Sequence, residues 1–137
     1  MLTALLLAFA LDPAPVTNGE YRRCVEAGRC RPAAFEDPRS AANLTTGKEE
    51  TAAAYRKVAA SGQPAVGISW SDARAYCAFA GKRLPTAREL PVRLADAAVA
   101  VWLADARGSR RAVRGRGARG FEERTARAPW LGLRCAK

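Results

Sequence analysis

The fold of this chain is decided by residues 65–86, which read AVGISWSDARAYCAFAGKRLPT. The first four residues are apolar and predict a short buried strand. Ser69 precedes Asp72 by three positions, a spacing that satisfies free backbone amides at the start of a helix. Gly81 and Pro85 predict where this helix ends. The residues expected on its buried face recur at helical spacing and are Ala73, Tyr76, Cys77 and Ala80.

Upstream of this stretch, the sequence predicts one helix and a long loop. Thr17 and Glu20 have the spacing of a capping box, so we expect a helix from about Asn18 to Ala27. Residues 31–64 contain two prolines near their start, several polar residues and no long apolar period. We therefore expect an extended surface loop, with one helical turn across residues 49–60.

Downstream of it, a second capping box predicts a third helix. Thr86 and Glu89 repeat the spacing, so this helix is expected to begin after Pro85. Pro91 strains its second turn, because proline lacks a backbone N–H. The residues expected to continue its buried stripe are Leu94, Ala97, Ala98, Val101 and Trp102.

The composition favours one folded domain and excludes histidine chemistry. The chain has 137 residues, of which 49% are hydrophobic and 26% are charged, as expected for a single folded domain. It contains no histidine, so a Ser-His or Cys-His catalytic pair and a histidine-ligated metal are excluded. The formal charge of +10 favours acidic partners and says nothing about the fold.

Three motifs in order resemble the formylglycine-generating-enzyme, or sulfatase-modifying-factor, family. Residues 65–86 resemble its V-x-V-S-W-x-D-A-x-x-Y-C-x-W-A-G-K-R-L-P-T-E segment. Residues 15–21 (PVTNGEY) resemble its early P-V-T-N-x-x-Y, and residues 132–135 (GLRC) its closing G-F-R-C. The resemblance implies an α+β fold of the C-type-lectin-like type. We expect a minimal version, with two to three helices, short antiparallel strands and much irregular loop.

We expect residues 11–137 to form a single sulfatase-modifying-factor-like domain, preceded by a stretch with two interpretations. Residues 1–10 (MLTALLLAFA) are apolar and too short to span a bilayer. Their small-x-small ending is typical of a signal-peptidase site, so the stretch is a remnant signal peptide in one interpretation. The resemblance implies the other interpretation, in which it is an apolar first strand.

Four cysteines, an even number, suit a disulfide framework. Cys24 and Cys30 are six positions apart at the expected end of a helix, so a local bridge is feasible. The resemblance implies that Cys77 and Cys135 are joined across the core. The alternative is four reduced thiols in a cytoplasmic protein. Because disulfides persist in oxidising compartments, the framework favours an extracytoplasmic location, periplasmic or secreted.

The resemblance also raises an enzymatic alternative. The family's oxidases bind copper(I) through a cysteine pair near the closing motif and convert a substrate cysteine to formylglycine, and soft thiolates suit copper(I). Residues 78–134 contain no cysteine, so this pair has no counterpart here. We therefore expect no catalytic residue, no metal and no cofactor. Copper enters only if the chain is a divergent oxidase or a subunit of one.

The candidate binding residues lie in the C-terminal third. Residues 107–119 contain six arginines and no acid, which is typical of a solvated loop and also suits an acidic ligand. No aromatic residue lies between the arginines, so nucleic acid is a less favoured partner than a protein, a peptide or an acidic ligand. Trp70, Trp102 and Trp130 are expected as core anchors, and Trp102 is the candidate if one of them faces a ligand groove. The candidates are Trp102, Arg110, Arg111, Arg114 and Arg116.

The sequence thus predicts a non-catalytic sulfatase-modifying-factor-like module with a binding or structural role. Its binding face is expected on irregular C-terminal loops that a rigid frame of helix and strand holds in place.

Overall fold

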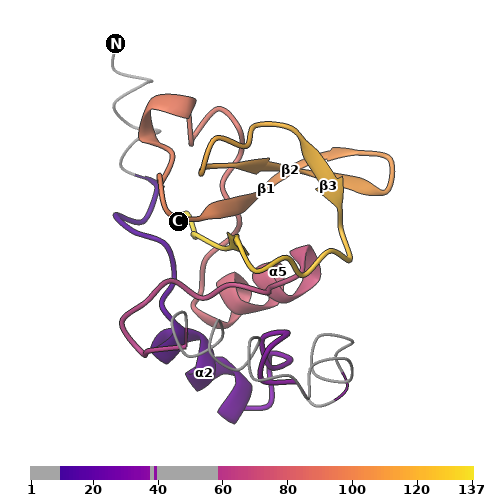
Figure 1. Ribbon diagram of the computed structural model, residues 1–137. Helices are drawn as coiled ribbons and strands as arrows, with labels where there is room; N and C mark the ends of the chain where they lie inside the picture. The colour runs from indigo at the N-terminus through magenta and orange to yellow at the C-terminus, as the bar shows by residue number, and fades with distance from the viewer. Residues whose placement is uncertain (1–9, 38, 40–58) are drawn as a thin grey trace.

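The computed structural model describes residues 10–37, 39 and 59–137. Two α-helices lie on one side of a small sheet, with the second helix nearer the strands (Figure 1). The fold is α+β, as predicted. Its elements are α2 (Asn18–Glu26), α5 (Trp70–Phe79), the 3-10 helix η1 (Val92–Leu94), β1 (Ala100–Arg107), β2 (Arg110–Arg114), β3 (Phe121–Glu123) and β4 (Leu131–Gly132).

The four strands form one mixed sheet in the order β3-β2-β1-β4. β1 and β2 form an antiparallel hairpin, and β3 pairs antiparallel with β2. β4 runs parallel to β1, so the expectation of antiparallel strands is wrong at this edge. The reason is topological: β4 follows β3 through residues 124–130, which return the chain to the far side of β1.

Both predicted helix starts are confirmed by their caps. The Thr17 side chain accepts a hydrogen bond from the Glu20 amide, and the Glu20 side chain accepts one from the Thr17 amide. At the start of α5, the Ser69 side chain accepts a hydrogen bond from the Asp72 amide. Two residues after the end of each helix lies a glycine, Gly28 or Gly81, with φ of +73°, a left-handed conformation that glycine adopts without strain.

The early, central and closing motifs lie side by side through backbone hydrogen bonds. The Val16 amide donates to the Leu133 carbonyl, and the Ala65 amide donates to the Val16 carbonyl, both at 2.9 Å. Gly132 is required by this packing, because a Cβ there would lie 2.2 Å from the Ala65 carbonyl oxygen. Three motifs that are far apart in the sequence are therefore parts of one packed unit.

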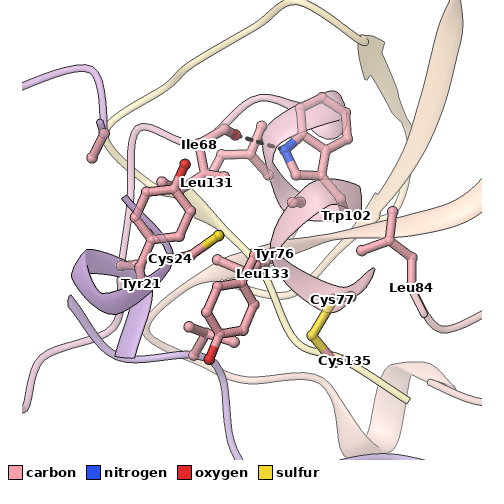
Figure 2. Close-up of a cluster of buried hydrophobic side chains, with 14 of the residues drawn as sticks. Tyr21, Cys24, Ile68, Tyr76, Cys77, Leu84, Trp102, Leu131, Leu133 and Cys135 are labelled. Carbon is pink, nitrogen blue, oxygen red and sulfur yellow. Dashed lines mark hydrogen bonds between the residues drawn. A yellow bond between two sulfur atoms is a disulfide. The ribbon is translucent and has the colours of Figure 1, made fainter. Parts of the chain in front are cut away.

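The main core lies between the helices and the sheet, and Figure 2 shows part of it. Trp102, on β1, is completely buried, and its indole N–H donates to the Ile68 carbonyl at 2.7 Å. From the helices, Tyr21 and Tyr76 pack with their ring centroids 5.9 Å apart. The predicted buried face of α5 is confirmed for three residues, whereas Ala80 caps the helix and is exposed.

The third predicted helix is wrong. Thr86 and Glu89 do exchange the hydrogen bonds of a capping box, at 3.0 and 3.3 Å. The chain then continues as a turn, since Pro91 has no N–H to donate, and only the 3-10 helix η1 follows. Val101 and Trp102 are buried as expected, but they belong to β1 rather than to a helix.

Three segments also differ from their sequence predictions. Residues 65–68 are buried but do not form a strand, and Gly67 among them has φ of +73°, outside the range of a β-strand. Residues 107–119 are largely a β-hairpin arm rather than a loop. Ala33 and Ala34 are buried, so the segment after residue 31 is not a surface loop there. The predictions for residues 1–9 and for the turn at residues 49–58 lie outside the described residues.

None of the helices in the described part of the chain has the length and apolar content needed to cross a bilayer.

Candidate functional site

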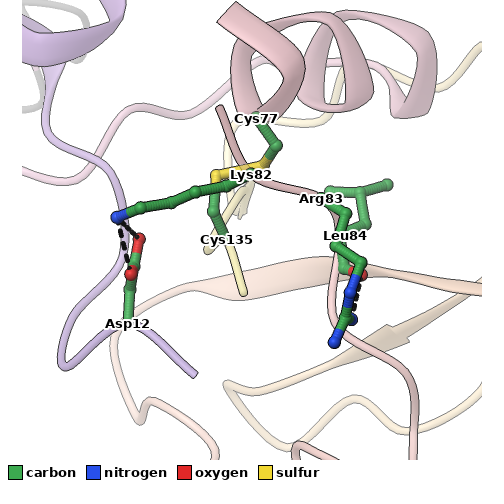
Figure 3. Close-up of a disulfide and its surroundings, with 6 residues drawn as sticks. All are labelled: Asp12, Cys77, Lys82, Arg83, Leu84 and Cys135. Carbon is green, nitrogen blue, oxygen red and sulfur yellow. Dashed lines mark hydrogen bonds and ion pairs between the residues drawn. A yellow bond between two sulfur atoms is a disulfide. The ribbon is translucent and has the colours of Figure 1, made fainter. Parts of the chain in front are cut away.

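All four cysteines are engaged in two disulfides. Cys24 is joined to Cys30, with their Cα atoms 5.3 Å apart, and Cys77 is joined to Cys135, with their Cα atoms 5.6 Å apart. Figure 3 shows the second bridge, which ties the end of α5 to the C-terminal segment. No cysteine of the chain is free. The thiolate pair that binds copper(I) in the family's oxidases cannot form while these cysteines are in disulfides, so the four cysteines do not fit such a copper site in this form.

Carboxylates do not supply a metal site either. Among residues 10–37, 39 and 59–137, no three histidine, cysteine, aspartate or glutamate side chains come together as metal ligands would.

The predicted binding arginines do not gather into one site. Arg110 forms an exposed ion pair with Glu123 at 3.1 Å. Arg114 donates to the carbonyls of Ala87 and Leu90, at 2.9 and 2.7 Å, so it fastens the turn after Pro85 to β2. Arg116 is exposed on the turn beyond β2. Of the four, Arg111 alone contacts an aromatic ring, as described next.

Trp102 lies in the core rather than at a groove, and Trp70 packs against the edge of the core. Trp102 has no exposed surface, so the prediction that it faces a ligand groove is wrong. Trp70 is only partly buried, at the start of α5, and its indole N–H donates to the Leu103 carbonyl at 3.0 Å. The Arg111 and Arg74 guanidinium carbons lie 4.6 and 5.6 Å from the Trp70 ring centroid, within cation–π range. Arginines therefore surround Trp70 and not Trp102.

A pocket of about 680 Å³ opens beside α5, and we call it the α5 pocket. Its helical wall consists of Trp70, Arg74 and Ala78, which recur every four residues on the face away from the core. The other walls come from the segment after the helix and from β1. The remaining lining residues are Lys82, Arg83, Leu84, Thr86, Arg88, Glu89 and Ala104.

One wall of the α5 pocket is fixed by an ion pair between the half-exposed Arg83 and the buried Glu89. Arg83 donates two hydrogen bonds to the Glu89 carboxylate, at 2.6 and 2.7 Å, and the Glu89 side chain is 3% exposed. Hydrogen bonding from Arg83 lowers the pKa of Glu89 to about 2, even though burial opposes this shift. The same bond raises the pKa of Arg83. The pair therefore stays charged at neutral pH.

The remaining charges leave the α5 pocket positive. Lys82 is paired with Asp12 at 2.8 Å, as Figure 3 shows. Arg74 and Arg88 are exposed, and in the described part of the chain neither has an acidic partner. The pocket thus combines apolar walls with two cations that no acid neutralises.

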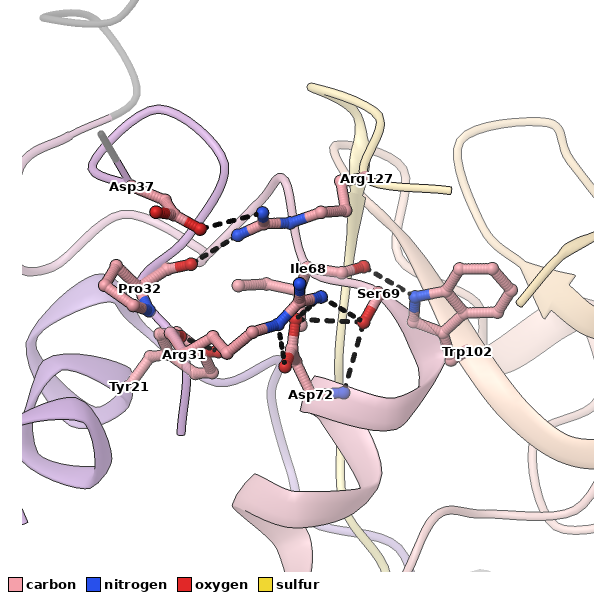
Figure 4. Close-up of polar contacts among 9 residues, drawn as sticks. All are labelled: Tyr21, Arg31, Pro32, Asp37, Ile68, Ser69, Asp72, Trp102 and Arg127. Atoms are coloured by element: carbon pink, nitrogen blue, oxygen red, sulfur yellow. Dashed lines mark hydrogen bonds and ion pairs between the residues drawn. The ribbon is translucent and has the colours of Figure 1, made fainter. Parts of the chain in front are cut away.

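A separate polar network supports the start of α5 and was not predicted (Figure 4). Arg31 donates to both Asp72 carboxylate oxygens, at 3.0 and 2.8 Å, and the Ser69 hydroxyl donates to Asp72 at 2.9 Å. Burial raises the pKa of the Tyr21 hydroxyl, which remains protonated and donates to the Arg31 carbonyl at 2.5 Å. The network joins the segment after α2 to the cap of α5.

A second contact secures the same segment. Arg127 donates to the Pro32 carbonyl and forms an ion pair with Asp37 at 3.2 Å. All of these groups are used in holding the chain together, so we assign them a structural role.

The packed motifs and the two disulfides define a class of protein, and comparison with known families agrees. The model of the sulfatase-modifying factor enzyme 1-like domain matches residues 3–100. The chain belongs to this family. The matched range includes both helices, whereas the closing Gly132–Cys135 motif lies beyond it.

A Bos taurus protein named inactive C-alpha-formylglycine-generating enzyme 2 is a similar relative. The two sequences are 36% identical over 107 residues, which cover 59% of this chain and 36% of the bovine protein. The match thus spans about a third of that relative's length.

The sequence did contain a signal for the α5 pocket. Trp70, Arg74 and Ala78 share one helix face, opposite the predicted buried face, so Trp70 and Arg74 could have been placed together in solvent. Arg88 could not have been added, because its position depends on the turn that replaces the predicted third helix.

Proposed function

We propose that this chain is a non-catalytic member of the sulfatase-modifying-factor family and acts as a binding module. The observation that carries the proposal is that all four cysteine sulfur atoms are in disulfides. The chain's own residues therefore provide no thiolate pair for copper(I), on which the family's oxidation of cysteine depends. The name of the bovine relative, which describes it as inactive, supports the same conclusion.

The scaffold is proposed to be of the C-type-lectin-like type, and the location extracytoplasmic. Two disulfides in a chain of this size support an oxidising compartment, periplasmic or extracellular. In such a scaffold the frame of helices and strands holds the binding surface, and we place that surface at the α5 pocket. The positive charge around the pocket favours an acidic ligand.

The proposal is tested by copper(I) titration together with an assay for oxidation of a cysteine-containing peptide. We expect no stoichiometric copper binding and no formylglycine product, measured by mass spectrometry of the peptide. The control is the double variant Cys24→Ala/Cys30→Ala under the same conditions, because it retains the long-range bridge. Tight copper binding with turnover by the wild-type protein would show that the chain is a divergent oxidase, or a subunit of one.

A further inference from the structure

We propose that the α5 pocket binds a small organic anion in which a planar apolar group is joined to an oxyanion such as a phosphate. The inference rests on the function proposed above and adds the chemical class of the ligand. It is argued from the walls, the charges and the rigidity of the pocket.

The walls provide the apolar half of the recognition. Trp70, Ala78, Leu84 and Ala104 line the pocket, and Leu84 is almost completely buried, so it lies at the base. A volume of about 680 Å³ is within the range of roughly 300–1,000 Å³ that is typical of small-molecule sites. A planar apolar group placed here would leave water, and this transfer is favourable.

The arginines are placed to bind the anionic half of the ligand. Arg74 comes from α5 and Arg88 from the turn after Thr86, so the pocket receives cations from two segments. A guanidinium group presents paired N–H donors that match the oxygens of phosphate or carboxylate. Glu89 does not counter this charge, because both its oxygens accept hydrogen bonds from Arg83.

The pocket is held in shape before any ligand arrives. The Trp70 indole is hydrogen-bonded to the Leu103 carbonyl, and the Ala104 amide donates to the Pro85 carbonyl at 2.8 Å. The Cys77–Cys135 disulfide fixes the end of α5. Little conformational entropy is therefore lost on binding, which favours a small ligand with few contacts.

A long acidic polymer fits these observations less well. Arg110 is occupied by Glu123, and Arg114 is occupied by carbonyl groups, so neither extends the cationic surface of the α5 pocket. Arg74 and Arg88, which have no acidic partner in the described part of the chain, instead lie beside apolar walls in a single pocket. This arrangement favours a compact ligand.

The test compares three probes by isothermal titration calorimetry: 2-naphthyl phosphate, 2-naphthol and inorganic phosphate. We expect 2-naphthyl phosphate to bind at least about tenfold more tightly than either fragment, since only it engages both halves of the pocket. The NMR resonances of the three tryptophan indole N–H groups then show where the probe binds. The Trp70 resonance should shift on titration, and that of the buried Trp102 should not.

Single-residue variants then test which arginines supply the positive charge that binds the ligand. Arg74→Gln and Arg88→Gln remove exposed cations without breaking an ion pair, so both should fold. Each is expected to weaken binding of 2-naphthyl phosphate about fivefold, as removal of a partly exposed charged hydrogen bond does. Arg29→Gln is the matched control, because Arg29 is also exposed but does not line the pocket. It should leave the affinity unchanged.

Several results would overturn the ligand assignment. They are no binding of 2-naphthyl phosphate at millimolar concentration, equal affinity for 2-naphthol or for phosphate alone, and equal weakening by Arg29→Gln. A polymer-binding role would appear as binding of a polyanion such as heparin that Arg74→Gln and Arg88→Gln leave unchanged, and that result would also contradict the assignment. None of these outcomes bears on copper binding or turnover, so they are distinct from a failure of the proposed function.

Discussion

Removing the Cys77–Cys135 disulfide is expected to destabilise the protein more than removing the Cys24–Cys30 disulfide. The first bridge closes a loop with a sequence separation of 58 and the second a loop with a separation of 6. A cross-link restricts the unfolded chain, and the restriction grows with the logarithm of loop length. The relation gives about 4 kcal/mol for the long loop and about 2 kcal/mol for the short one.

The burial of the cysteines, like the loop length, makes loss of the Cys77–Cys135 disulfide the more destabilising of the two. Both Cys77 and Cys135 are completely buried, whereas Cys30 is only partly buried. Alanine is the suitable replacement at these positions, because a serine hydroxyl would be left without a partner in the core. A loss of about 4 kcal/mol is a large part of the roughly 5–15 kcal/mol that stabilises a typical domain.

The assay is urea unfolding of the two double variants, Cys77→Ala/Cys135→Ala and Cys24→Ala/Cys30→Ala, against the wild-type protein. Circular dichroism and tryptophan fluorescence should give coincident transitions if unfolding is two-state. The long-loop variant is expected to have the lower free energy of unfolding, by about 2 kcal/mol. Equal stability of the two variants, or the reverse order, would refute the reasoning.

Three further predictions concern single residues. Because its folded-state pKa is about 2 and unfolded glutamate titrates near pH 4.3, Glu89 stabilises the protein above about pH 4.3, and this stabilisation is lost as the pH falls toward 2. Glu89→Gln should lower the free energy of unfolding by at most roughly 3 kcal/mol at neutral pH, since Arg83 is half exposed. It should also flatten the acid limb of a plot of stability against pH, whereas Glu122→Gln should leave that limb unchanged. Gly132→Ala should lower the melting temperature because of the clash with the Ala65 carbonyl, and Gly120→Ala, where a Cβ meets nothing within 4 Å, should not. Trp102→Phe should cost about 1–3 kcal/mol through the unpaired Ile68 carbonyl, and a smaller loss than for Trp70→Phe in thermal unfolding would argue against its role in the core.

Much of the frame could be predicted from local patterns. Thr17 with Glu20, and Ser69 with Asp72, act within one helical turn, so their caps form as the spacing indicates. The Cys24–Cys30 bridge is also local. The Cys77–Cys135 bridge could be expected only through the family resemblance, because no short-range pattern brings these residues together.

The failures occurred where long-range contacts decide the structure. Thr86 and Glu89 form their capping contacts, but Arg83 engages the Glu89 carboxylate and Pro91 stops the helix. Trp102 follows a stretch of alanines and valines, and only the β1 pairing reveals that it enters the core. The α5 pocket combines residues from α5, the turn and β1, and their proximity depends on the whole fold.

The central claim is that every cysteine sulfur of this chain is committed to the scaffold, and non-reducing peptide mapping with a free-thiol count tests it most directly. The protein should be denatured without reductant, treated with an alkylating agent, digested and analysed by mass spectrometry. We predict no alkylated cysteine and two cross-linked peptide pairs, Cys24 with Cys30 and Cys77 with Cys135. Two alkylated cysteines would contradict the account, because thiolates would then be available for copper, and a different pairing would contradict the fold described above.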